Sequence, residues 1–315
     1  MEITADAREQ GLARPSLSWM RVVGHIGRLA LGLIFLASGV LKAVDPAEFA
    51  HQIAGYGIIG PQLARLTAPA LIVFEIALGV ALVAGVRPLL TATASILLLL
   101  AFIAIEAYGI AAGRTESCGC FGAYLKRTPG EVIVEDFLFI GLALLAILGL
   151  RGWAGARPGR AAVILVAALC LSTAFVIASP SLPIDDVVTR LRAGRTLADL
   201  DLAARLPQLA QGRHLVALID VTDPRAAEIA AALDALASGS GAPPVIGLTP
   251  SSEQEIDAFR WTVVPAFEIK SVDRDVIKRL YRKLPRFFVL DSGRVVAVYD
   301  GAPPGARDLL SSESS

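Results

Sequence analysis

The sequence predicts a bundle of membrane-spanning helices followed by an α/β domain. Of the 315 residues, 55% are hydrophobic and only 18% are charged, and the mean hydropathy is +0.62. Such values are unusual for a soluble globular chain and typical of a membrane protein. The apolar character ends near Ser179-Pro180. Beyond that point short strand patterns alternate with helical ones, which indicates an α/β fold.

Five apolar runs are long enough to cross a bilayer as helices, which takes ~20 residues. Asp45-Pro46 ends the first run, Arg87-Pro88 separates the second from the third, and Arg157-Pro158 precedes the fifth. Backbone groups in lipid must be hydrogen-bonded within their own segment, so we expect every run to be helical. The runs cover residues 24–44, 66–86, 88–112, 131–150 and 160–178.

Basic residues beside the spans predict the orientation in the inner (plasma) membrane. They are more numerous on the side of the N-terminus, so the positive-inside rule places that end in the cytoplasm. Five crossings then place the region after residue 178 on the periplasmic or extracellular side. Residues 1–20 are polar and no cleavage site follows the first run, so this run is expected to be an uncleaved signal. Arg8, Arg14, Arg21, Arg87, Arg151, Arg157 and Arg160 lie on the inner side, against Lys42, Arg65, Arg114, Lys126 and Arg127.

The pattern from His214 onward predicts the elements of the α/β domain. Residues 215–219 and 245–248 read as buried strands, and residues 287–299 read as a β-hairpin. Residues 225–237 and 253–259 read as helices, the second after a Ser/Thr cap. A further helix is expected at 275–282, helical spacing is seen over 197–209, and the expected core includes Trp261, Phe267, Tyr281, Phe287 and Phe288.

These patterns divide the chain into six parts. They are a cytoplasmic N-terminal segment (1–23), a four-helix transmembrane domain (24–150), a fifth transmembrane helix (151–180), a linker (181–211), the α/β domain (212–303) and a tail (304–315).

Cys118 and Cys120 are the candidate catalytic residues. They lie one residue apart in a polar loop after the third run, on the side where disulfides can form. A disulfide at this spacing closes a small, strained ring and should be a good oxidant, and the nearby Arg114, Lys126 and Arg127 favour the thiolate. The alternative is a purely structural pair. A metal role would be limited to a soft ion such as Cu(I), and no metal site is predicted, since zinc needs four ligands.

Ionisable residues inside the spans form a second group of candidates, because charge in lipid is costly. Lys42, Glu75, Glu106 and Glu135 could form a polar pocket under the cysteine loop, with a carboxylate as proton relay. The alternative is that Lys42 pairs with a carboxylate and fixes the packing of the bundle. Cys170, in the fifth run, is expected to be a small buried apolar residue.

Residues from about 25 to 150 resemble the MauE branch of the DoxX-like membrane proteins. The matching pieces are Ser38-Gly39-Val40-Leu41-Lys42, then Glu75, and Cys118-Gly119-Cys120-Phe121-Gly122. The resemblance implies a part in methylamine utilisation or, more broadly, in forming or maintaining disulfides in an exported partner. For the MauE proteins that partner is taken to be the small, disulfide-rich subunit of methylamine dehydrogenase. DoxX relatives also suggest contact with quinone, which is the cofactor that the resemblance implies.

Residues from about 212 to 303 resemble a thioredoxin-like domain of the TlpA type. Asp223 and Ala226 stand where that family carries the two cysteines of its Cys-Pro-x-Cys motif, and Pro285 matches its cis-proline. A domain without these thiols cannot perform thiol exchange by itself. It is interpreted as a docking or covering module, in which Asp223 caps the following helix.

Two functions follow as hypotheses. In the first, Cys118 and Cys120 act as a thiol-disulfide oxidoreductase between a quinone-type acceptor and an exported, disulfide-containing client. In the second, the chain is a non-catalytic membrane assembly factor whose thioredoxin-like domain binds that client. Membrane lipid is the other expected partner. The formal net charge of +0 gives no support to nucleic acid as a partner.

Overall fold

The computed structural model describes residues 16–113, 128–239, 242–305 and 308–309, with side chains from residue 19 onward. The chain divides into two compact units, Met1–Leu182 and Pro183–Ser315. Each unit is described by itself.

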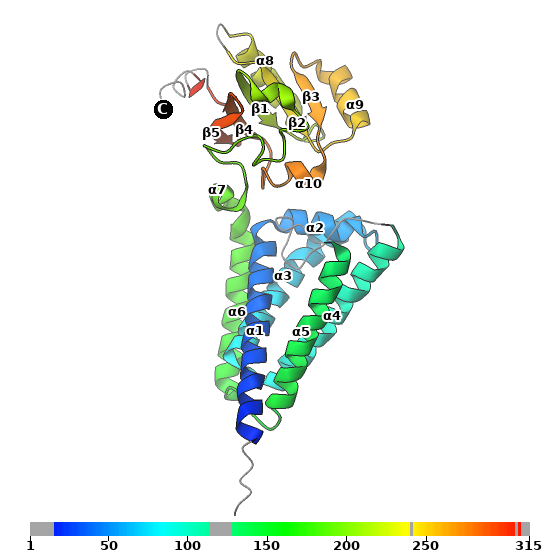
Figure 1. Cartoon of the computed structure of the whole chain (residues 1–315), viewed down its shortest axis with the longest axis vertical. Coiled ribbons are helices and arrows are strands. Elements are labelled where there is room, and N and C mark those ends of the chain that lie inside the picture. Colours follow the sequence, from blue (N-terminus) through cyan, green and yellow to red (C-terminus); the bar gives the residue numbers. More distant parts are fainter. Residues whose placement is uncertain (1–15, 114–127, 240–241, 306–307, 310–315) are drawn as a thin grey trace, which may run out of the picture. The chain divides into compact units, whose positions relative to one another are not determined.

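The first unit is a bundle of long apolar helices. Within its described part, five helices are long and apolar enough to cross a membrane, as the sequence predicted, and they run alongside one another in Figure 1. A shorter helix that the sequence analysis missed, α2 (Pro46–Gly55), lies across one end of the bundle. The long helices are α1 (Ser16–Val44), α3 (Pro61–Ala84), α4 (Pro88–Ala111), α5 (Pro129–Gly149) and α6 (Pro158–Ala178).

Proline residues explain where the helices begin. Each of α2 to α6 has a proline in its first turn, where a missing backbone N–H is tolerated. The Asp45 side chain also accepts a hydrogen bond of 3.0 Å from the Glu48 N–H, which caps α2. Asp45-Pro46 therefore ends the first span and also starts α2.

Helices α1 and α3 approach each other closely at two glycines. A Cβ built on Gly79 would lie 2.9 Å from the Gly32 carbonyl oxygen and 2.8 Å from Leu36 Cγ. Small residues permit this kind of backbone contact between membrane helices. An apolar core packs beside the contact and contains Leu31, Phe35, Leu78, Leu82, Leu99, Phe139 and Ala143.

Large apolar side chains cover the outside of the bundle, as expected for helices that face lipid. Leu66, Val134 and Leu171 are 72%, 69% and 71% exposed. Cys170 is exposed as well, so the expectation that it is buried is wrong. The buried face of α6 includes Ala168 and Ser172. Cys170 lies midway between them in sequence, which places it on the opposite side of the helix.

The second unit is built on a mixed sheet. In its described part the sheet has 5 strands in the order β3-β2-β1-β4-β5. Strand β2 is parallel to β1 and β3, and β4 is antiparallel to β1 and β5. The strands are β1 (Arg213–Leu218), β2 (Val245–Thr249), β3 (Glu268–Ser271), β4 (Arg286–Asp291) and β5 (Arg294–Asp300), and the helices are α7 (Asp185–Val188), α8 (Ala226–Ala237), α9 (Glu253–Val263) and α10 (Arg274–Ile277). Strand β3 was not predicted.

The two faces of this sheet pack against separate apolar cores, because side chains alternate along a strand. Leu215 and Ala217 contribute to the core with α8 and α9, whereas Val216 and Leu218 contribute to the core with α10 and residues 191–209. The leucines of residues 197–209 are buried, but helical spacing is the wrong interpretation for them. Thr196 and Asp199 form a hydrogen-bonded turn there, and Pro207–Ala210 forms only a 3₁₀ turn.

Two smaller expectations are also wrong. The helix expected at 275–282 is limited to α10, which ends at Ile277. Trp261 is 87% exposed, whereas the other aromatic residues expected in the core are buried. Helix α9 buries Ile256 and Phe259, and Trp261, two residues beyond Phe259, points away from that face.

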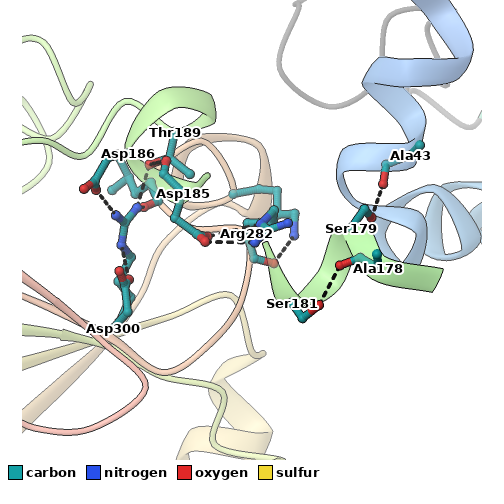
Figure 2. Close-up of polar contacts among 12 residues, drawn as sticks. Ala43, Ala178, Ser179, Ser181, Asp185, Asp186, Thr189, Arg282 and Asp300 are labelled. Carbon is teal, nitrogen blue, oxygen red and sulfur yellow. Dashed lines mark hydrogen bonds and ion pairs between the residues drawn. The ribbon is translucent and has the colours of Figure 1, made fainter. Parts of the chain in front are cut away.

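Buried arginines hold the first residues of the second unit against its sheet. Arg282 Nη2 lies 2.9 Å from Asp185 Oδ2 (Figure 2). Arg286 is 0% exposed and lies 2.8 Å from Asp186 Oδ1 and 2.7 Å from Asp300 Oδ1. These ion pairs make the segment around α7 part of the second unit. Within the first unit, the Ser179 hydroxyl donates to the Ala43 carbonyl (Figure 2), so the end of α6 is tied to the end of α1.

Candidate functional site

A cavity of about 200 Å³ lies inside the first unit, at the end of the bundle that α2 crosses. Its wall is mostly aliphatic and aromatic, with charged groups at Lys42 and Glu106. Concave, mostly apolar spaces with a few polar groups are typical sites for small molecules. The residues around it are Lys42, Phe49, Ile53, Tyr56, Ile58, Ile59, Thr67, Leu71, Phe102, Ile105, Glu106 and Val132.

Lys42 and Glu75 form a buried ion pair next to the cavity. Lys42 Nζ lies 2.5 Å from Glu75 Oε1, and the two side chains are 3% and 0% exposed. The Ser38 hydroxyl donates to Glu75 Oε2 over 3.1 Å. A buried charge needs such partners, because removal from water costs several kcal/mol for each ion. A pair between Lys42 and a carboxylate was one of the two alternatives from the sequence, and the structure shows that Glu75 is the partner.

Aromatic rings also surround the Lys42 ammonium group. Nζ lies 5.0 Å from the centre of the Phe49 ring and 4.9 Å from that of Phe102. Both distances are within the range in which a ring face attracts a cation. The cavity wall therefore carries a positive group that is held by a carboxylate and by two rings.

Glu106 provides the second charged group of the cavity. The Tyr56 hydroxyl donates to Glu106 Oε1 over 2.8 Å, and the Glu106 residue is 3% exposed. The other oxygen, Oε2, has no hydrogen-bond partner among the residues that the structure describes. This oxygen is the polar atom of the wall through which a bound molecule could be recognised.

The candidate cysteines lie next to this end in sequence. Glu106 is near the C-terminal end of α4, and Val132 is near the start of α5. The segment that joins these two helix ends therefore leaves and returns at the end of the bundle that holds the cavity. Cys118 and Cys120 belong to this segment and lie outside the described residues, as do Arg114, Lys126 and Arg127.

The structure separates the remaining charged candidate from the cavity. Glu135 is partly buried on α5 and is not among the residues that surround the cavity. Tyr56 and Phe49 do contribute, although the sequence analysis did not single them out. Both come from α2 or its end, and no helix had been expected at residues 46–55 after the first span. The position of Tyr56 shortly after the first predicted span was the only sequence feature that could have indicated its place in the cavity wall.

In the second unit, Asp223 and Ala226 precede and begin α8. Ala226 is 2% exposed, and the helix is capped at Arg225, so Asp223 is not the capping residue as expected. Instead the Arg225 side chain and N–H donate to the Asp223 carboxylate, which lowers the pKa of Asp223. The Leu284-Pro285 peptide bond is cis. Among the described residues, no group of His, Cys, Asp and Glu could hold a metal ion.

The helices and the cavity define a multi-pass membrane protein with a charged pocket inside its bundle. The family model "Methylamine utilisation protein MauE" matches residues 20–154. The methylamine utilization protein MauE of Paracoccus denitrificans is 32% identical over 125 residues, which are 39% of this chain and 67% of that protein. The chain therefore belongs to the MauE family. The match ends before α6 and the second unit, and no solved structure matches the chain.

Proposed function

We propose that this chain supports the maturation of an exported protein of the methylamine-utilisation type, through thiol–disulfide exchange at Cys118 and Cys120. The observation that carries the proposal is the cavity, which lies at the end of the bundle from which the cysteine segment leaves α4 and returns to α5. The MauE relative is named for methylamine utilization, and the proposed pathway is taken from that name. In this proposal the cavity end faces the outer, oxidising side of the inner membrane.

The cavity fits a quinone ring as the electron acceptor. Its volume is about 200 Å³ and its wall includes Phe49, Phe102 and Tyr56, while Lys42 and Glu106 supply polar groups that would hold the carbonyl or hydroxyl oxygens. When bound, a quinone takes up two electrons and two protons. Oxidation of the Cys118–Cys120 dithiol to a disulfide releases the same number of each, so the two half-reactions balance.

The residues of the cavity would position charge and protons. Tyr56 and Glu106 form a hydrogen-bonded pair at the wall, which can hold an exchangeable proton next to a bound ring. Lys42 keeps a positive charge at the same wall, and Glu75 compensates for it. This arrangement permits a charged group inside the bundle without an unpaired ion.

The second unit is proposed to be a thioredoxin-like domain that binds the client. Three features support this assignment. Strand β1 leads into α8 at the position of Asp223 and Ala226, the Leu284-Pro285 bond is cis, and β4 and β5 form a hairpin directly after it. Since both cysteine positions of the motif are replaced, the domain would present the client rather than oxidise it.

The replaced cysteines also favour a second candidate function. In this alternative the chain is a non-catalytic assembly factor, and the client binds to the second unit without any exchange at Cys118 and Cys120. The two functions differ in which part of the chain is required.

Complementation separates the two functions. A host that lacks its own MauE protein would receive the wild-type chain, Cys118→Ser, Cys120→Ser or a chain without residues 212–303, and growth on methylamine would be measured. We expect both serine variants to fail, while the control Cys170→Ser, which changes an exposed cysteine of α6, supports growth. Growth with both serine variants, together with failure of the truncated chain, would establish the assembly factor instead.

A further inference from the structure

The end of the first unit opposite the cavity carries a surface of exposed arginines. Arg21 lies near the start of α1, Arg87 directly precedes α4, and Arg151 lies two residues after the end of α5. Arg157 and Arg160 lie before and within the first turn of α6. All of these side chains are exposed. We call Arg21, Arg87, Arg151, Arg157 and Arg160 the arginine surface.

Acidic side chains do not balance this charge among the described residues. The arginine surface makes no ion pair with any of them. The described carboxylates of the first unit lie toward the cavity end, or within α3 in the case of Glu75. They are Asp45, Glu48, Glu75, Glu106, Glu131, Glu135 and Asp136.

Contacts between the loops hold the arginine surface together. The Ala156 N–H donates to the Gly85 carbonyl over 2.9 Å, so the turns before α4 and α6, which carry Arg87 and Arg157, lie next to each other. Gly24 on α1 lies against Gly149 on α5, since a Cβ on Gly24 would be 2.9 Å from Gly149 Cα. This contact brings the helix ends that carry Arg21 and Arg151 together.

A buried arginine fixes the same region from inside. The Arg28 guanidinium donates to the Leu82 carbonyl and, over 2.9 Å, to the Val83 carbonyl. It also lies 5.4 Å from the centre of the Trp153 ring. The His25 ring packs edge-on against the same Trp153 ring, with 4.7 Å between the ring centres. Arg28 is 7% exposed, so its role is to stabilise the packing of this end of the bundle. Only the exposed arginines of the arginine surface can contact a ligand.

Tryptophans at this end place it at the level of the lipid headgroups. Trp19 and Trp153 are 59% and 38% exposed, and tryptophan is enriched at the boundary between lipid and water. A set of unpaired guanidinium groups at that level complements phosphate, which Arg binds through two parallel hydrogen bonds. We propose that the arginine surface binds the phosphate groups of anionic phospholipids in the leaflet on this side of the membrane.

The test compares lipids around the full-length protein. The protein would be placed in nanodiscs of phosphatidylcholine mixed with an equal amount of phosphatidylglycerol, and retained lipids would be identified by native mass spectrometry. We expect the wild type to retain phosphatidylglycerol over phosphatidylcholine. The triple variant Arg87→Gln, Arg157→Gln and Arg160→Gln should lose this preference, with a decrease of up to ~fivefold for each arginine removed.

Two control variants separate the site from general charge and from misfolding. Arg65→Gln removes an exposed arginine at the start of α3, toward the opposite end, and should keep the full preference. Replacement of the same three arginines by Lys keeps the charge and should retain most of it. A glutamine variant that prefers phosphatidylglycerol as strongly as the wild type, or an equal loss in Arg65→Gln, would overturn the proposal.

Two further experiments are needed. The first applies if the glutamine variant does not fold, and the second tests whether the ligand is a free anion rather than a lipid. If the glutamine variant does not fold, the wild type would be compared at low and high salt, where screening should weaken the preference, and a preference unchanged by salt overturns the proposal. Inorganic phosphate added to the same nanodiscs should leave the retained phosphatidylglycerol in place. Displacement of the lipid by free phosphate at a comparable concentration would contradict a lipid site.

Discussion

Lys42 Nζ lies 2.5 Å from Glu75 Oε1, across a separation of 33 residues between α1 and α3. Both side chains are buried inside a bundle of membrane length, where an unpaired charge is most costly. The pair therefore joins two helices and also sets the charge of the cavity wall.

Removal of one partner should destabilise the bundle strongly. Lys42→Met leaves the Glu75 carboxylate buried without its cation, so we expect a loss of about 3–5 kcal/mol. The double variant Lys42→Met, Glu75→Leu should lose much less, because no uncompensated charge remains. Thermal unfolding in detergent, followed by tryptophan fluorescence, measures both. Equal destabilisation of the single and double variants would show that the pairing is not the stabilising element.

The contact between α1 and α3 at Gly79 should not tolerate a larger side chain. Gly79→Leu must place atoms where Leu36 and the Gly32 carbonyl already lie, and overpacking of this kind costs about 1–3 kcal/mol. The matched control is Gly141→Leu on α5, where a Cβ meets nothing within 4 Å. We expect the unfolding temperature to fall in the first variant only. If both variants unfold at the wild-type temperature, the helices do not pack at Gly79 as described.

Glu106 should determine the affinity of the cavity for a quinone. Glu106→Leu removes the carboxylate that faces the cavity and the partner of the Tyr56 hydroxyl. A hydrogen bond to a charged group contributes about 1.5–3 kcal/mol, so we expect binding of a short-chain quinone to weaken at least ~tenfold, as measured by fluorescence quenching. Tyr108→Phe changes an exposed residue of the same helix and should bind normally. Unchanged binding in Glu106→Leu would remove the cavity from the proposed function.

Arg286 should be essential for the order of the first residues of the second unit. Arg286→Met removes the cation that pairs with Asp186 and Asp300, whose side chains are 74% and 59% exposed, and the donor to the buried Thr189 hydroxyl. A hydrogen bond from a charged group contributes about 1.5–3 kcal/mol. We expect limited proteolysis of the full chain to cleave the region around α7 faster than in the wild type. Lys283→Gln, at an exposed position nearby, serves as control. Equal cleavage rates in all three proteins would contradict the role of the arginine.

The sequence was sufficient for the spans because each contains a long apolar run between breaking residues. It was not sufficient for α2, since the Asp45-Pro46 pair that ends one helix also starts the next, and both outcomes have the same local signal. Lys42, Glu75 and Glu106 could be selected because charge is rare in spans. A pair between Lys42 and a carboxylate was one alternative from the sequence. Its partner could not be identified as Glu75, because that depends on the register between α1 and α3.

The second unit shows the same limit. Strands β1, β2, β4 and β5 could be predicted from short β-branched and aromatic runs, but β3 and the exposure of Trp261 could not. The exposure of Trp261 depends on which face of α9 packs on the sheet, and a bulky aromatic residue is normally evidence for the buried face.

The most direct test of the proposed function is the redox state of Cys118 and Cys120 in native membranes. Free thiols would be trapped with an alkylating reagent that adds mass, with and without added quinone, in a Cys170→Ser background. We predict a mixture of dithiol and disulfide at rest that shifts toward disulfide when quinone is added. A pair that stays in one state regardless of quinone would contradict redox cycling at these residues.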